Sequence, residues 1–358
     1  MFECLGTYPL PTDLFAQSIH PSKPLVAIGL YNGRVSVIRP ENGSLINTLW
    51  TTARHKGSVR ALSFSHDGTA VFSAGVDGLV KCADSETGKV TQKCAIPDWE
   101  KDHPYTMHTL SPQTLLLGTD LGLLHVYDLR EKLGKPQASH QPHDEYISSI
   151  TSLPPTKEST SGLAKQWIST GGTMLAVTDL RKGVVSKSED QEVELLSSLH
   201  VSGLSKRGTN VGEKVPVGCE DGYLRLFEKG VWDDMDERVA VTPGETLDAM
   251  CLVPEKVSPQ GKNVVAIGAG DGYIKFLKMG SNKVVDGGVF QHSREDGVDY
   301  LGFDVSGRMI SGGGNTVKIW ALTEAGEDEE EQEEEDEEVK RPKKRKQKTK
   351  QHDFGGLD

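Results

Sequence analysis

Short apolar runs separated by glycine-containing turns repeat along most of the chain. In residues 70–90, AVFSAGVDGLVKCADSETGKV, one β-prone run ends at Val76, and the dipeptide Asp77-Gly78 forms a turn before the second run. Asp-Gly and Asn-Gly dipeptides favour the primed two-residue turns that join tight antiparallel strands. Each copy of the unit is therefore predicted to contain a β-hairpin.

The unit recurs at a nearly constant period. Its turns fall at positions 33, 78, 122, 172, 222, 272 and 315, which are 43 to 50 residues apart. A period of this size predicts a repeat architecture. The most regular copy predicts four strands over residues 59–65, 70–76, 79–84 and 89–95. Because several short strands occur per period and helical periodicity is absent, the fold class is predicted to be all-β.

The repeated residues resemble the WD-repeat family. In VDGLVKCADSETGKV the pair Ala83-Asp84 stands where that family has Trp-Asp, and Val126-Tyr127-Asp128 and Lys318-Ile319-Trp320 are closer matches. The resemblance implies a seven-bladed β-propeller over residues 1–322. The last unit has three predicted strands, at 298–305, 308–312 and 316–322, and the family completes its final blade with an N-terminal strand. Residues 2–10 are predicted to be that strand, which removes an unpaired edge.

The resemblance also implies structural hydrogen-bonded sets of one His, one Ser or Thr, one Asp and one Trp. In blade two, His55, Ser73 and Asp77 match three of these roles, while Ala83 replaces the Trp. In blade seven the matching residues are His292, Ser311, Asn315 and Trp320. The other blades are degenerate. Two polar insertions, at 157–166 and 201–214, are predicted to be surface loops, either tolerated insertions or partner-binding loops.

The last residues differ sharply in composition from the repeats. The net charge of the chain is −12, and residues 323–358 contribute −6 of it, from 14 acidic and 8 basic residues. Residues 327–338 are acidic except for Gln332, and residues 340–350 contain eight basic residues. Like-charge blocks of this length are typical of disordered interaction tails, so residues 323–358 are predicted to be disordered.

The basic run at 340–350 predicts a nuclear-localisation signal. Several extended cations in register fit the acidic groove of an importin-type receptor. The residues proposed to carry it are Lys340, Arg341, Lys343, Lys344, Arg345 and Lys346. Contact between the same tail and RNA phosphates is compatible with import.

Two near-identical segments end the third strands of adjacent units. They contain Asp128 with Arg130, and Asp179 with Arg181. They resemble the paired Asp-x-Arg boxes that WD-repeat receptors present to the adaptor of cullin-type ubiquitin ligases, where an Arg fork contacts the partner. The other interpretation is ordinary turn chemistry at the end of a strand.

No motif predicts an enzyme. Gly268, Gly270 and Gly272 are not followed by a predicted helix, so they form a hairpin turn and not a dinucleotide loop. The five cysteines form no C-x-x-C pair, and no nucleophile is paired with a base. We therefore expect no catalytic activity, cofactor, metal or small-molecule substrate. No apolar run of 18 residues occurs, so no membrane span is expected. The chain is also expected to be a monomer.

The order of units, the segments FAQSIHPSKPLVAIGLYNGRV and HKGSVRALSFSHDGT, and the acidic-then-basic tail resemble one WD-repeat subfamily. That subfamily is nucleolar and associated with ribosome biogenesis. The resemblance implies a non-catalytic scaffold of the nucleus and nucleolus that binds proteins of pre-ribosomal particles. Two alternatives remain open: a substrate receptor of a cullin-type ligase, and a histone- or chromatin-binding propeller.

Overall fold

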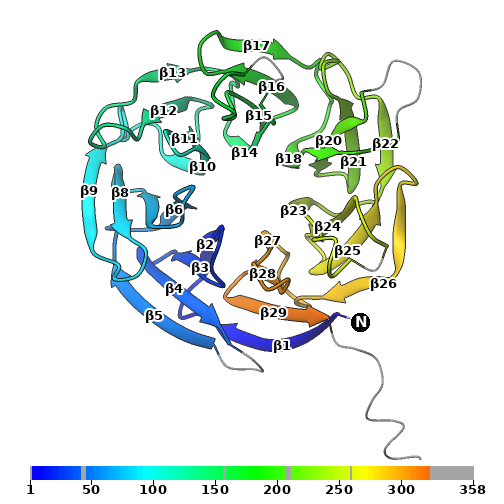
Figure 1. Cartoon of the computed structure of the whole chain (residues 1–358), viewed down its shortest axis with the longest axis horizontal. Coiled ribbons are helices and arrows are strands. Elements are labelled where there is room, and N and C mark those ends of the chain that lie inside the picture. Colours follow the sequence, from blue (N-terminus) through cyan, green and yellow to red (C-terminus); the bar gives the residue numbers. More distant parts are fainter. Residues whose placement is uncertain (1, 42–45, 156–158, 206–210, 259, 323–358) are drawn as a thin grey trace, which may run out of the picture. The chain divides into compact units, whose positions relative to one another are not determined.

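The computed structural model describes residues 2–41, 46–155, 159–205, 211–258 and 260–322. These residues form seven antiparallel sheets, or blades, arranged radially around a central channel (Figure 1). Within them the secondary structure consists of strands, turns and bends, and no helix is long and apolar enough to cross a membrane. The predicted all-β, seven-bladed propeller is confirmed. The predicted tail, 323–358, lies outside the described residues.

The strands of each blade are given from the channel outward. Blade 1 contains β2 (Leu14–Ile19), β3 (Val26–Leu30), β4 (Arg34–Pro40) and β5 (Ile46–Ala53), and blade 2 contains β6 (Val59–Phe64), β7 (Ala70–Gly75), β8 (Leu79–Asp84) and β9 (Val90–Ala95). Blade 3 contains β10 (Pro104–Ser111), β11 (Thr114–Thr119), β12 (Leu124–Asp128) and β13 (Ala138–His140), and blade 4 contains β14 (Ile147–Ser152), β15 (Gln166–Gly171), β16 (Met174–Asp179) and β17 (Gly183–Lys187).

Blade 5 has a fifth, short strand. It contains β18 (Leu195–Ser198), β20 (Glu213–Cys219), β21 (Tyr223–Glu228) and β22 (Glu237–Ala240), and β19 (Val201–Ser202) also pairs with β20. Blade 6 contains β23 (Leu247–Leu252), β24 (Val264–Ala269), β25 (Tyr273–Lys278) and β26 (Lys283–Gln291). Blade 7 contains β27 (Tyr300–Phe303), β28 (Met309–Gly313), β29 (Thr316–Leu322) and β1 (Phe2–Pro9).

The N-terminal strand β1 is the outer strand of blade 7. It pairs antiparallel with β29, from Phe2 opposite Leu322 to Pro9 opposite Thr316. The Phe2 ring is 5 % exposed and makes edge contacts with three aromatic rings of blades 6 and 7, those of Phe276, Phe290 and Phe303. The two ends of the propeller are thus joined by main-chain hydrogen bonds and by a shared apolar cluster.

The core lies between neighbouring blades. One cluster combines Phe72 and Val80 of blade 2 with Leu115 and Leu117 of blade 3, and similar clusters occupy the other junctions. A single four-stranded sheet cannot cover its own apolar faces, so each blade is stabilised by its two neighbours.

In five blades the repeated turn is longer than the predicted two residues, whereas in blades 4 and 7 the residues 172–173 and 314–315 join paired strands as predicted. The turn between β7 and β8 has three residues, with the Gly78 N–H donating to the Gly75 oxygen at 3.0 Å, and Asp77 keeps a negative φ while Gly78 has φ +71°. This is a type I turn followed by a left-handed glycine, not a primed two-residue turn. The reason is that only glycine adopts a positive φ at little cost, and this geometry needs only one such residue. In blade 7 the left-handed residue is Gly314, not Asn315.

The insertion in blade 5 is only partly a loop. Val201 is fully buried and belongs to the cluster between blades 5 and 6, and β19 pairs with Glu213 and Lys214 of β20. Apolar side chains at the start of the insertion therefore extend the sheet before the chain leaves it.

Candidate functional site

The inner strands place a ring of side chains at one end of the channel. In six blades a β-bulge near the start of the inner strand turns one residue out of the ladder, and these residues are Phe15, Arg60, Tyr105, Ser148, Leu196 and Asp248. In blade 7, Asp299 follows the buried Val298 as Asp248 follows the buried Leu247. All seven line one cavity of about 560 Å³, which we call the channel mouth. Bulges commonly re-aim side chains in this way.

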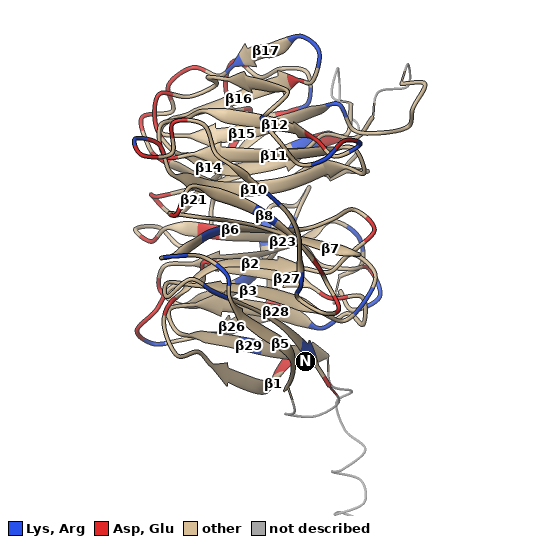
Figure 2. Ribbon diagram, turned by 90° about the vertical axis from the view of Figure 1, so that its left-hand side faces the viewer, with Lys and Arg blue, Asp and Glu red and all other residues tan. Residues whose placement is uncertain are grey.

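The channel mouth opens on one face of the propeller, which we call the channel face. It is made by the turns between the second and third strands of each blade and by the connections from one blade to the next. The turns between the first and second strands, and between the third and fourth, form the opposite face. Figure 2 shows the propeller from the side, with Asp and Glu on successive loops of the channel face, at the left.

Arg60 is the cation of the channel mouth. Its guanidinium carbon lies 5.6 Å from the centre of the Phe15 ring and 5.4 Å from that of Tyr105, and its charge is paired with Asp120 at 3.6 Å. The planar guanidinium stacks on aromatic faces while it keeps its hydrogen-bonding edge. Burial raises the pKa of the Tyr105 hydroxyl, so this side chain stays neutral.

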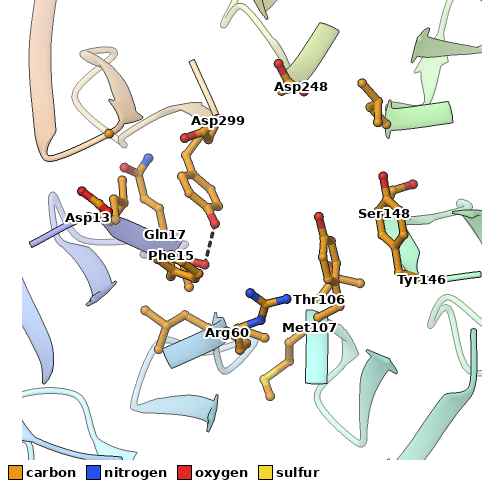
Figure 3. A pocket seen from close by; sticks show the side chains of 18 residues that line it. Asp13, Phe15, Gln17, Arg60, Thr106, Met107, Tyr146, Ser148, Asp248 and Asp299 are labelled. Atoms are coloured by element: carbon orange, nitrogen blue, oxygen red, sulfur yellow. Dashed lines mark hydrogen bonds between the residues drawn. The ribbon is translucent and has the colours of Figure 1, made fainter. Parts of the chain in front are cut away.

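Two carboxylates, Asp248 and Asp299, lie on the other side of the channel mouth from Arg60 (Figure 3). Asp248 accepts a hydrogen bond from Thr246 Oγ1 at 2.6 Å. Burial raises the pKa of Asp248, and burial together with the charge of Asp248 raises the pKa of Asp299 to about 6. Like charges that face one another in a confined space oppose ionisation, and a cation bound between them would relieve this repulsion.

The set predicted in blade 2 is assembled by the structure. His55 Nδ1 lies 2.7 Å from Asp77 Oδ1, and His55 Nε2 lies 2.8 Å from Ser73 Oγ. Because the carboxylate only accepts, Nδ1 carries the proton and Nε2 accepts from the Ser73 hydroxyl. Burial acts to raise the pKa of Asp77, but the hydrogen bond and charge of His55 outweigh it and hold that pKa at about 2.

In blade 7 the structure joins three of the four predicted residues. Trp320 Nε1 donates to Ser311 Oγ at 2.8 Å, and His292 Nδ1 lies 2.8 Å from the same oxygen. The fourth, Asn315, is a correction to the prediction: its side-chain oxygen accepts from Thr316 Oγ1 at 3.2 Å, and its main-chain oxygen accepts from the N–H of Leu10. Gly314 takes the left-handed position of the turn, and no hydrogen bond between Asn315 and His292 is found among the described residues.

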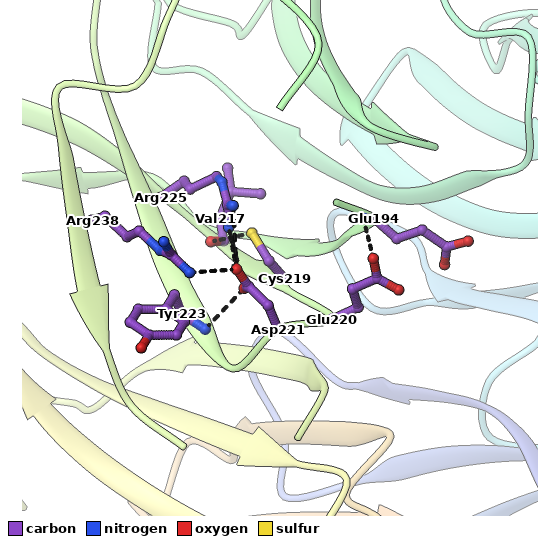
Figure 4. Close-up of polar contacts among 8 residues, drawn as sticks. All are labelled: Glu194, Val217, Cys219, Glu220, Asp221, Tyr223, Arg225 and Arg238. Atoms are coloured by element: carbon purple, nitrogen blue, oxygen red, sulfur yellow. Dashed lines mark hydrogen bonds and ion pairs between the residues drawn. The ribbon is translucent and has the colours of Figure 1, made fainter. Parts of the chain in front are cut away.

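Blades 4 and 5 contain sets that the sequence did not reveal. In blade 4, His143 Nε2 lies 2.9 Å from Ser169 Oγ. In blade 5, Asp221 accepts from Arg225 and from Arg238, the latter at 2.8 Å, and Arg238 stacks on the Tyr223 ring (Figure 4). The sequence did contain a signal, because Asp221 stands at the same turn position as Asp77 and Arg225 follows it by four residues, as Lys81 follows Asp77.

Acid is expected to destabilise the propeller through its buried histidines. Burial lowers the pKa of both His143 and His292 to about 4, against about 6.5 in an unfolded chain. The stabilisation is complete above pH 6.5 and is lost as the pH falls towards 4, by about 1.4 kcal/mol per pH unit for each histidine. The measurement is the free energy of unfolding in urea between pH 7.5 and 4.5.

The control for this prediction is the double variant His143→Gln, His292→Gln. It is expected to be less stable at pH 7.5 but to lose less stability on acidification, and the contribution of the carboxylates cancels in the comparison. Equal slopes for the two proteins below pH 6.5 would show that these histidines are not the acid-sensitive groups.

The residues of the two Asp-x-Arg segments lie at the ends of β12 and β16, on the opposite face. Arg130 donates through Nε and its terminal nitrogen to Asp128, and this hydrogen bond lowers the pKa of Asp128 to about 2. Asp179 accepts hydrogen bonds from Gln166 Nε2 and from the main-chain N–H of Arg181. Arg181 itself is an exposed residue. The Arg130 fork is therefore occupied within its own turn. The predicted localisation residues, Lys340 to Lys346, lie outside the described residues.

The fold defines the class of protein: a WD-repeat β-propeller, which typically serves as a non-catalytic interaction scaffold. A family model for the WD40 domain of anaphase-promoting complex subunit 4 matches residues 17–108. The chain is 50 % identical to the WD repeat-containing protein JIP5 of Phaeosphaeria nodorum, covering 92 % of this chain and 85 % of that protein. It is 49 % identical to the WD repeat-containing protein JIP5 of Coccidioides immitis, and the match covers 92 % of this chain and 83 % of that protein. The chain therefore belongs to the family of WD repeat-containing JIP5 proteins.

Proposed function

We propose that this protein is a scaffold in nucleolar ribosome biogenesis that binds proteins of pre-ribosomal particles through its channel face. The observation that carries the proposal is the channel mouth, where side chains from all seven blades converge on one cavity. An opening lined by ionisable and aromatic side chains suits the recognition of a protein segment. The nucleolar role rests on the subfamily resemblance and on the relationship to JIP5 proteins.

Entry into the nucleus is proposed to depend on the basic run at 340–350. Six closely spaced cations, Lys340, Arg341, Lys343, Lys344, Arg345 and Lys346, offer an extended positive segment to an importin-type receptor. Contact of the same run with RNA would add to association with pre-ribosomal particles, and such contact weakens steeply with salt.

One experiment tests location and partners together. A full-length fusion to a fluorescent protein and an affinity tag is expected to accumulate in the nucleolus and to retain pre-ribosomal proteins after nuclease treatment. Replacing Lys343, Lys344, Arg345 and Lys346 with Ala should leave it in the cytoplasm and reduce that recovery at least tenfold. The readouts are microscopy and quantitative mass spectrometry of the purified complexes.

The matched control removes four exposed lysines from the propeller, Lys56, Lys101, Lys132 and Lys256. It loses the same charge and should remain nucleolar. Recovery of a ligase adaptor or of histones in place of pre-ribosomal proteins would contradict the proposed function. Nuclear accumulation of the tail variant would contradict the proposed localisation signal.

A further inference from the structure

A line of aromatic rings crosses the channel face from blade 1 to blade 4. The centres of the Tyr31 and Phe15 rings are 5.5 Å apart, Arg60 lies between Phe15 and Tyr105, and the Tyr105 and Tyr146 rings are 4.7 Å apart. Tyr31, in the turn after β3, is 59 % exposed. We call these five residues the aromatic line. Its rings follow one another in a row that already holds one guanidinium group.

The other half of the channel face carries more carboxylates than cations, with Arg294 as an exposed cation beside Glu295. The connections and turns of blades 4 to 7 bear the exposed carboxylates of Asp144, Glu145, Glu192, Glu220, Glu245 and Glu295. Asp248 and Asp299 add two more carboxylates at the channel mouth. Burial raises the pKa of both, and the charge of Asp248 adds to the effect at Asp299. The field of such a surface attracts cations and repels polyanions.

One side chain, arginine, is complementary both to aromatic ring faces and to carboxylates. A guanidinium stacks on a ring and donates paired hydrogen bonds to a carboxylate, whereas a lysine ammonium is a point charge that stacks less well. Arg60 itself combines both contacts, since it lies over two rings and is paired with Asp120. The channel face repeats this combination around an open cavity.

We propose that the channel face binds an arginine-bearing basic segment of a partner protein, with one arginine placed between Asp248 and Asp299 and neighbouring arginines on the aromatic line. This inference rests on the proposed scaffold function and names the chemistry of the partner. The partner segment is extended, because the aromatic line and the carboxylate pair lie on different sides of one opening (Figure 3).

Two other occupants fit less well. The basic run at 340–350 of the chain itself has six lysines and two arginines, so it offers few groups for stacking on the aromatic line. Single-stranded RNA stacks on aromatic rings, but its phosphates would face the carboxylates of blades 4 to 7.

The test uses the full-length protein and a fluorescein-labelled octapeptide of alternating glycine and arginine, followed by fluorescence anisotropy at 150 mM salt. The double variant Asp248→Asn, Asp299→Asn is expected to raise the Kd at least tenfold. Its control, Glu131→Gln with Glu255→Gln, removes two exposed carboxylates from the opposite face and should leave the Kd unchanged. The acidic run at 327–338 is the same in all variants, so its contribution cancels.

Three further arms identify the occupant. Tyr31→Ala, at an exposed position, should weaken binding several-fold, and an octapeptide of glycine and lysine should bind several-fold more weakly than the arginine peptide. Arg60→Gln should tighten binding, because it removes the positive charge nearest the site. An anionic ligand would show the opposite response to Arg60→Gln.

Equal affinity of the arginine peptide for the wild type and for the Asp248, Asp299 variant would overturn the inference. So would binding that appears only after the basic residues of 340–350 are replaced, which would identify the chain's own tail as the occupant. A labelled oligouridine strand whose binding is weakened by Arg60→Gln would replace the partner protein with RNA. In each case continued co-purification of pre-ribosomal proteins would leave the proposed function intact.

Discussion

Deletion of residues 1–9 is expected to lower the melting temperature by more than about 10 °C and to cause aggregation on heating. The deletion removes β1, which pairs with β29 along its whole length, and it removes the buried Phe2 ring from its cluster. Loss of that ring alone is expected to cost about 3–5 kcal/mol, and each kcal/mol corresponds to roughly 2–4 °C in a large domain. The exposed edge of β29 would then be free to pair with other chains.

Two point variants separate packing from strand pairing in this prediction. Phe2 and Leu322 face each other in the register, but Phe2 is buried and Leu322 is 46 % exposed. Phe2→Ala is expected to cause a large part of the loss, while Leu322→Ala should change the stability by about 0.5 kcal/mol or less. Differential scanning fluorimetry and light scattering measure both effects. If the variant that lacks residues 1–9 has the same melting temperature as the full-length chain, β1 does not close the propeller.

Gly222→Ala is expected to reduce the free energy of unfolding by more than about 4 kcal/mol. Gly222 has φ +79°, and a Cβ atom there would lie 1.8 Å from the main-chain oxygen of Thr242. That oxygen cannot move away, because the N–H groups of Val241 and Thr242 both donate to the Gly222 oxygen, at 3.1 and 3.0 Å. The connection from blade 5 to blade 6 is thus held directly against the turn of blade 5.

Gly244→Ala is the matched control for that variant. Gly244 also has a left-handed conformation, φ +92°, but no atom lies within 4 Å of the position of its Cβ. Gly244→Ala should reduce the free energy of unfolding only by the cost of placing an alanine in a left-handed conformation, about 1–2 kcal/mol. Urea unfolding of both variants measures the difference, which isolates the contact between the turn and the connection. Similar losses at the two positions would show that this contact contributes little.

The sequence was a reliable guide wherever the determining interactions are local. Strand β8 begins and ends at the predicted residues, and strands β6 and β7 end one residue early, because alternation of apolar residues and a turn glycine specify a hairpin within one unit. The set of His55 and Ser73 was visible for the same reason, since the two residues are 18 apart within one regular unit. In blade 4, the insertion at 157–166 increases the separation of His143 and Ser169 to 26 residues, so the regular spacing does not identify this pair.

The sequence by itself determined the all-β class, the seven units and the positions of their turns, because a repeated local pattern needs no knowledge of distant contacts. It also marked the tail as a separate segment by its charge. Only the tertiary structure decided the composition of the channel mouth. Phe15, Arg60, Tyr105, Asp248 and Asp299 come from five blades, and a β-bulge is one unpaired residue with no sequence signature of its own. These side chains meet because the ring closes, and closure depends on the pairing of β1 with β29 across more than three hundred residues.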